Sequence, residues 1–147
     1  MNTLLKALAL LAVLSSFSAN AQQAQRFNDY TVHYNALNSS LISPEVAKAY
    51  GISRSDSRAL INISVLKNTE NQLPVAVKAV VTASGRNLIG QTRAIEMREI
   101  AEGEDAIYYI GELSVRNMET FDFTVEVRPE GQSKPFTVKF RQQFYTE

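Results

Sequence analysis

The sequence predicts an all-β fold, an antiparallel, immunoglobulin-like β-sandwich of about seven strands with one short helix between the first and second strands. Apolar and polar residues alternate with a period of two in separate runs, and turn-forming residues divide these runs. Seven short strands over about 120 residues are typical of such a sandwich, and a closed barrel is the alternative. The runs cover residues 26–36, 58–67, 75–84, 92–100, 106–113, 120–128 and 136–145.

The first run, residues 26–36, is predicted to form a single strand. Its alternation places Val32 and Tyr34 on one face and Phe27 and His33 on the opposite face. The face that carries Val32 is expected to point into the core, because β-branched and aromatic residues pack well on a half-buried strand.

The segment after this strand breaks the period of two and reads as a helix of about two turns. Ser43 is a suitable N-cap, Pro44 suits the first helical position and Glu45 places an acid in the first turn. Gly51 can adopt the left-handed conformation that ends a helix.

The second and third runs differ in character. Residues 58–67 put Ile61, Ile63 and Val65 on one side, as expected for a strand with one buried face. Residues 75–84 are mostly apolar on both faces, which suits a central strand. The fourth and fifth runs are divided by an acidic, Gly-containing turn at residues 102–105.

The last two runs are predicted to pair as a hairpin whose register follows from the loop between them. With residues 129–134 as that loop, Phe123 faces Phe140 and Asp122 lies opposite Arg141 on the outer face. A cross-strand pair of opposite charge contributes roughly 0.2 to 1 kcal/mol, which supports this register.

The N-terminal residues 1–21 are predicted to be a cleavable secretory signal peptide. Lys6 precedes an apolar run at 7–14, and the triplet Ala19-Asn20-Ala21 supplies an A-x-A cleavage site. Cleavage leaves 126 of the 147 residues, and residues 22–147 are expected to form a single periplasmic or secreted β-sandwich domain. No later run is long enough to span a membrane, which needs about 20 apolar residues.

Composition excludes several classes of function. The chain has 15 Lys and Arg against 15 Asp and Glu, so no net field attracts nucleic acid. It has no Cys and one His, so no disulfide, thiol nucleophile or multi-His zinc centre is available. No metal site and no cofactor are predicted.

Two short motifs resemble those of enzymes. Residues 85–92 match a phosphate-binding loop, but Gln91 replaces its lysine and the segment joins two predicted strands, so an ordinary turn is expected. Ser64 and Lys67 match S-x-x-K, yet three residues apart on a strand they point to opposite faces. Neither motif therefore indicates catalysis.

The residues around the helix resemble a known family. Tyr34-Asn35-Ala36-Leu37 and Tyr50-Gly51-Ile52, which flank the Ser43-Pro44-Glu45 helix start, are similar to a family of short exported gammaproteobacterial proteins catalogued as a domain of unknown function. The resemblance covers essentially the whole chain. It implies a periplasmic or secreted protein and no assigned reaction, ligand or catalytic residue.

We expect a non-enzymatic binding module for a protein, a peptide or an envelope component, with its surface at an edge strand or at the helix-capped end. The candidate cleft comprises His33, Tyr34, Asn35 and Tyr50. One alternative is a small periplasmic hydrolase or ligand-binding enzyme that uses His33 and the neighbouring Tyr and Asn residues. A second alternative is a structural envelope component.

Overall fold

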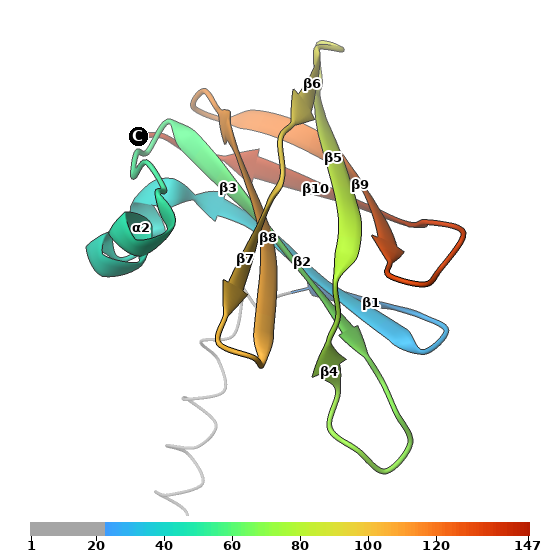
Figure 1. Cartoon of the computed structure of the whole chain (residues 1–147). Helices are drawn as coiled ribbons and strands as arrows, with labels where there is room; N and C mark the ends of the chain where they lie inside the picture. Colours follow the sequence, from blue (N-terminus) through green and yellow to red (C-terminus); the bar gives the residue numbers. More distant parts are fainter. Residues whose placement is uncertain (1–22) are drawn as a thin grey trace, which may run out of the picture.

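The computed structural model describes residues 23–147, and its strands form two antiparallel sheets that face each other (Figure 1). One sheet has six strands, in the order β1-β2-β3-β8-β7 with β4 beside β3, and the other has four, in the order β10-β9-β5-β6. The predicted signal peptide lies outside the described residues. The strands are β1 Gln23–Phe27, β2 Tyr30–Asn38, β3 Arg58–Lys67, β4 Val75–Ala76, β5 Ala79–Asn87, β6 Thr92–Ile95, β7 Arg98–Glu102, β8 Ala106–Ser114, β9 Glu119–Pro129 and β10 Phe136–Phe144.

The predicted sandwich and its core are confirmed. The inward faces of β3, β9 and β10 supply most of the largest fully buried side chains, because the inward positions of these strands are mostly apolar. The register predicted for the last hairpin is also confirmed, with Phe123 opposite Phe140. Arg141 donates from Nε to Asp122 Oδ1 at 2.7 Å and from Nη2 to Oδ2 at 2.9 Å, a bidentate pair on the outer face.

The first predicted strand is wrong as a single element, because it is a hairpin. β1 ends at Phe27 and β2 begins at Tyr30, and Asn28 between them has a φ of 51°, a conformation that Asn tolerates. Phe27 is the register partner of Tyr30 and stacks on Phe136 with ring centroids 4.8 Å apart. It therefore faces the core with Val32, and not the side of His33 as predicted.

Two other predicted strands each cross from one sheet to the other. Residues 75–84 divide into β4, beside β3, and β5, in the second sheet; residues 92–100 divide into β6 and β7 in the same way. The second crossing passes over Gly111, where an added Cβ would lie 2.6 Å from both Ile95 Cγ2 and Met97 Sδ. These two bends and the β1–β2 hairpin turn the expected seven strands into ten within the described residues.

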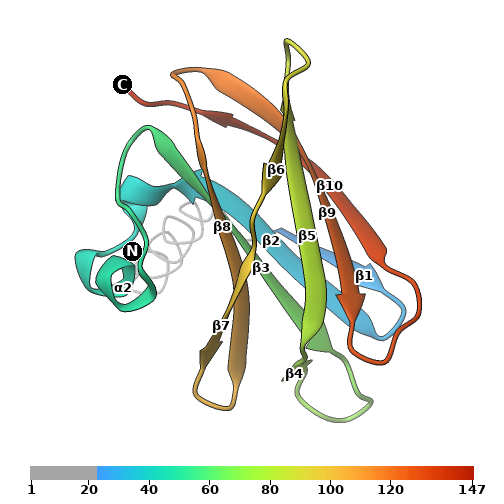
Figure 2. The same ribbon diagram turned by 45° about the horizontal axis from the view of Figure 1, so that its top comes forward.

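The predicted helix is confirmed as α2, Pro44–Tyr50, which follows a short 3₁₀ turn, η2, at Ser39–Leu41. The Ser43 hydroxyl accepts a hydrogen bond from the Val46 N–H at 3.3 Å, and Gly51 ends the helix with a φ of 66°. Figure 2 shows α2 outside the two layers of strands. It buries Ala47 against the outer face of the six-stranded sheet, in a second apolar cluster with Ile52, Leu60 and Ile110.

Candidate functional site

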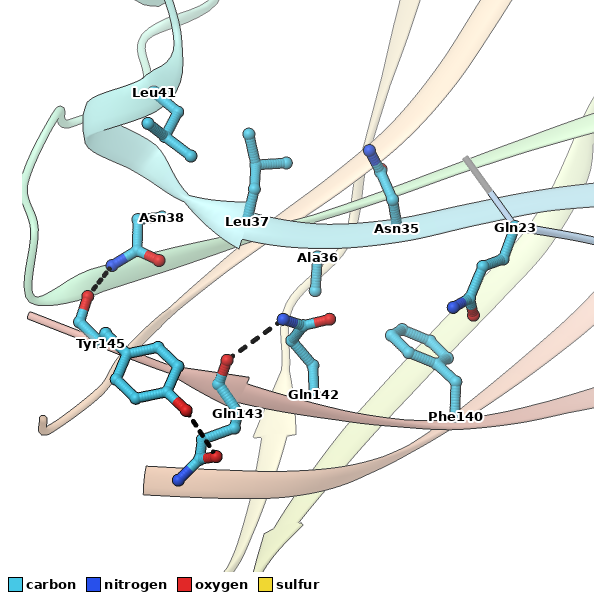
Figure 3. Close-up of a pocket in the computed structure, with 10 residues that line it drawn as sticks. All are labelled: Gln23, Asn35, Ala36, Leu37, Asn38, Leu41, Phe140, Gln142, Gln143 and Tyr145. Carbon is cyan, nitrogen blue, oxygen red and sulfur yellow. Dashed lines mark hydrogen bonds between the residues drawn. The ribbon is translucent and has the colours of Figure 1, made fainter. Parts of the chain in front are cut away.

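A cavity of about 490 Å³ lies between β2 and β10, at the side where the two sheets come together (Figure 3). We call this cavity the edge slot. Its lining consists of Gln23, Asn35, Ala36, Leu37, Asn38, Leu41, Phe140, Gln142, Gln143 and Tyr145.

The edge slot is bordered by strand edges, since consecutive residues of β2 line it. Asn35 and Leu37 belong to the outer face of the sheet, whereas Ala36 belongs to the inner face, and all three reach the slot. In Figure 3, Asn35 and Leu37 point away from β10 and Ala36 points toward it. On β10, inward Gln142 and outward Gln143 line the slot in the same way. β1 pairs with β2 only as far as Tyr34, so within the described residues 35–38 pair on the β3 side alone, and their other backbone edge borders the cavity.

The chemistry of the lining is amide-rich and uncharged. Five of its ten residues carry side-chain amides, and none carries a carboxylate, an ammonium or a guanidinium group. Phe140 and Tyr145 add aromatic surface, and the small Ala36 leaves the space open. The slot therefore suits an uncharged polar partner with many hydrogen-bonding groups.

Hydrogen bonds and ring packing fix the slot. Asn38 Nδ2 donates to the Tyr145 carbonyl at 2.9 Å, which joins β2 to the segment that follows β10. Tyr34 packs behind Phe140 with ring centroids 4.9 Å apart. The Tyr145 hydroxyl donates to Gln143 Oε1 at 2.9 Å. These contacts hold both strands in place, so the slot is preformed.

Asn35 has unused hydrogen-bonding capacity beside the slot. Its register partner on β3 is Asn62, and each of the two side chains has a buried Oδ1 that no described residue contacts by a hydrogen bond. A buried polar atom without a partner costs about 1 to 3 kcal/mol. A group bound beside the Asn35–Asn62 pair could donate the missing hydrogen bond to one of these Oδ1 atoms and remove that cost.

A second cavity, the helix-side pocket, has a volume of about 300 Å³ and lies between α2 and the outer face of the six-stranded sheet. Ile100 and Ile110 form part of its apolar wall, and Tyr50, Tyr108 and Glu102 add polar groups. Partial burial, and then the nearby carboxylate of Glu102, raise the pKa of Tyr50 above its ordinary value. Tyr50 therefore stays protonated as a hydrogen-bond donor.

The structure does not bring the four predicted site residues into one cleft. Asn35 lines the edge slot, Tyr50 lines the helix-side pocket, and Tyr34 lies on the inner face against Phe140. His33 is half-buried in a third depression with Ser64, its register partner, and Asp105. The hydrolase alternative requires these side chains to converge, and no hydrogen bond joins His33 to Ser64 or Asp105 among the described residues.

Both enzyme-like motifs lie in strands or turns, as the sequence predicts. Residues 85–92 span the end of β5, a turn and the start of β6, and Ser64 and Lys67 lie on β3. Across residues 23–147, no group of three or more His, Cys, Asp or Glu side chains is arranged to hold a metal ion. No helix in the same range has the length and apolarity needed to cross a membrane.

Four residues of the edge slot, Gln23, Asn38, Gln142 and Tyr145, are not among the site residues predicted from the sequence. Gln142 carried a usable signal, since it occupies an inward position in the alternation of β10, between the apolar Phe140 and Phe144. An uncharged amide at a position that the pattern reserves for the core indicates a local opening in that core.

A family model and a solved structure are both similar to this chain over most of its length. The family model for the domain of unknown function DUF4426 matches residues 24–147. A crystal structure of a DUF4426 family protein from Pseudomonas aeruginosa PAO1 resembles this chain with a TM-score of 0.74 and 32% sequence identity, over 88% of this chain and 98% of that chain. A search of curated proteins finds no match. The chain thus belongs to the DUF4426 family.

Proposed function

We propose that this protein is an exported, non-enzymatic binding module of the cell envelope that holds an extended peptide segment of another envelope protein in the edge slot. The segment would lie between β2 and β10 as an added strand. One observation carries the proposal: residues from both faces of β2 and of β10 line the slot, so that two backbone edges border it.

The dimensions of the slot suit a short strand. Residues 35–38 of β2 line it without interruption. Four strand residues at about 3.3 Å each extend for roughly 13 Å, which sets the bound segment at about four residues. Backbone hydrogen bonds would supply affinity, and the side chains of the segment would pack alternately toward Phe140 and toward solvent.

The amide lining favours a segment without charged residues. A charged side chain would lose hydration in the slot and find no opposite charge among the lining residues. Side-chain amides can both donate and accept, so Gln142 and Asn35 can satisfy backbone groups that the added strand leaves unpaired. Export supports the assignment to the envelope, since residues 1–21 have the pattern of a signal peptide.

Photo-crosslinking in living cells tests this proposal. A benzophenone amino acid is placed at Gln142, which lines the slot, or at Lys139, which lies on the outer face of the same strand. We expect a crosslinked protein adduct from position 142 and a much weaker one from position 139. The adduct should disappear when Ala36→Leu fills the slot, and an unchanged melting temperature shows that the variant is folded.

Three results would count against the proposal. Equal adducts from both positions would mean that the slot has no special role. An adduct that survives Ala36→Leu would place the partner elsewhere. An adduct that glycan hydrolases remove and proteases do not would identify an oligosaccharide as the occupant instead of a peptide.

A further inference from the structure

The turn between β5 and β6 lies at one end of the sandwich (Figures 1 and 2). It exposes two large aliphatic side chains. Leu88 is 66% exposed and Ile89 is 79% exposed. Turns of this kind are usually built from Gly, Asn, Asp, Ser or Pro, because these residues accept the required backbone conformations. Leu and Ile add neither turn propensity nor buried surface here, so folding does not account for them.

The turn is held rigidly in the position that displays these side chains. Asn87 is buried, its N–H donates to the Gln91 carbonyl at 3.0 Å, and its carbonyl accepts from the Gly90 N–H at 3.1 Å. Its side chain adds two bonds to Gln91, from the Gln91 N–H to Oδ1 at 2.9 Å and from Nδ2 to Gln91 Oε1 at 2.8 Å. The turn therefore presents Leu88 and Ile89 to solvent as a fixed projection.

A second loop brings another exposed apolar side chain to the same end. Met118, between β8 and β9, is 61% exposed and has a φ of 62°. Asn87 Nδ2 donates to Glu119 Oε2 at 3.1 Å, which ties this loop to the β5–β6 turn. Three apolar side chains, Leu88, Ile89 and Met118, thus project from two linked loops, and we call them the apolar tip.

Basic side chains flank the apolar tip. Arg86 is exposed, and a Cβ added to Gly90 would lie 3.4 Å from its Nη2, so its guanidinium rests against the turn. Arg116 is exposed two residues before Met118. The carboxylate of Glu119 is occupied by Asn87 and by the Arg116 N–H, which donates to Oε1 at 3.0 Å. Asp122 is the register partner of Arg86, and both of its carboxylate oxygens accept from Arg141. Among the described residues neither Arg86 nor Arg116 forms an ion pair, so both guanidinium groups can meet an anionic partner.

We infer that the apolar tip docks this protein on the surface of a bilayer that contains anionic lipids. Aliphatic side chains partition into the boundary between headgroups and acyl chains, and nearby arginines bind lipid phosphates. The net charge of the chain is zero, so attraction depends on this local arrangement and not on the whole molecule. This inference is independent of the edge slot.

Vesicle co-sedimentation tests the inference on residues 22–147, which contain both sheets. Vesicles of phosphatidylcholine alone are compared with vesicles that also contain phosphatidylglycerol. The test variant is Leu88→Ser/Ile89→Ser. The matched control is Leu73→Ser, which changes a leucine that is 86% exposed in a different loop. Both substitutions alter exposed residues, so both proteins are expected to fold.

We expect the wild type and Leu73→Ser to bind the phosphatidylglycerol vesicles with the same affinity. The double variant should bind these vesicles at least about tenfold more weakly. Arg86→Gln should weaken binding to these vesicles and abolish part of its salt dependence. Absence of wild-type binding, or equal binding by the double variant, would overturn the inference. Self-association of the wild type that the double variant abolishes, without vesicle binding, would assign the tip to a second copy of the chain instead.

Discussion

The crossing of β6 into β7 over β8 predicts that Gly111→Ala destabilises the fold. An added Cβ would lie 2.6 Å from Ile95 Cγ2 and Met97 Sδ and 3.0 Å from the Glu96 carbonyl oxygen. Carbon atoms pack best at about 3.5 to 4.0 Å, so the crossing strand must shift by roughly 1 Å. Overpacking of this kind costs about 1 to 3 kcal/mol. The cost is large beside a total stability of about 6 to 19 kcal/mol for a domain of this size.

Thermal unfolding followed by circular dichroism measures this effect. At about 3 °C per kcal/mol for a domain of this length, the melting temperature should fall by roughly 3 to 9 °C. Ser114→Ala is the matched control, because it changes an exposed residue of the same strand and should stay within about 0.5 kcal/mol of the wild type. The cost of Gly111→Ala should shrink in a Met97→Ala background, where one of the clashing atoms is gone.

A Gly111→Ala protein with the melting temperature of the wild type would contradict this prediction. It would mean that the chain does not pass over β8 at Gly111 and that the assignment of β6 and β7 to different sheets is wrong. A cost that is the same with and without Met97 would show that Met97 does not contribute to the clash.

Three further predictions concern the core, the helix and the outer hairpin pair. Phe123→Ala removes a ring that is 1% exposed and should lower the free energy of unfolding by about 3 to 5 kcal/mol. Reductant should affect neither the wild type nor the variant, because the chain has no Cys. An unchanged melting temperature or an unchanged denaturant midpoint would contradict this prediction. Gly51→Ala forces a Cβ into the left-handed conformation that ends α2 and should cost about 1 to 2 kcal/mol, so a more stable variant would argue against that helix end. Arg141 holds the pKa of Asp122 below its ordinary value of 3.8, so the pair stabilises the fold above that pH and loses its contribution as the pH falls through the folded-state pKa. Denaturant titrations from neutral to acidic pH should therefore show a smaller decline for Asp122→Asn than for the wild type, and identical declines would mean that the pair does not couple to folding.

The parts of the fold that follow from local pattern could be predicted from the sequence. The last hairpin was predictable down to the Asp122–Arg141 pair, because Phe123 and Phe140 lie in alternating stretches on either side of one short loop. The helix was predictable because Ser43 and Gly51 satisfy its two ends. In both cases the determining interactions lie between residues that are close in sequence or in a simple register.

The sheet crossings could not be predicted in the same way. A strand that bends from one sheet to the other keeps its alternation through the bend, so the period gives no sign of where Ile95 leaves one sheet and Arg98 enters the other. The β1–β2 turn did carry a signal, since Asn28-Asp29 is a pair that favours turns, but the surrounding alternation concealed it.

The candidate site was harder to predict from the sequence than the fold, because its residues come together only in the tertiary structure. Alternation assigns residues to the faces of a strand, but the edge slot is formed by strand edges of β2 and β10, far apart in sequence. The same alternation argued against placing Tyr34 beside His33, because neighbours on a strand point to opposite faces. Only Asn35 among the four predicted residues lines the slot.

A peptide that spans the crosslinked segment of the partner would test strand addition in the edge slot. Its binding to isotope-labelled residues 22–147 can be followed by NMR, with cross-strand nuclear Overhauser effects between backbone protons as the readout. Binding in the edge slot predicts such effects between the peptide and the edge of Ala36 or Gln142, together with slower amide exchange along that edge. Shift changes confined to the helix-side pocket, around Tyr50 and Ile100, would contradict it.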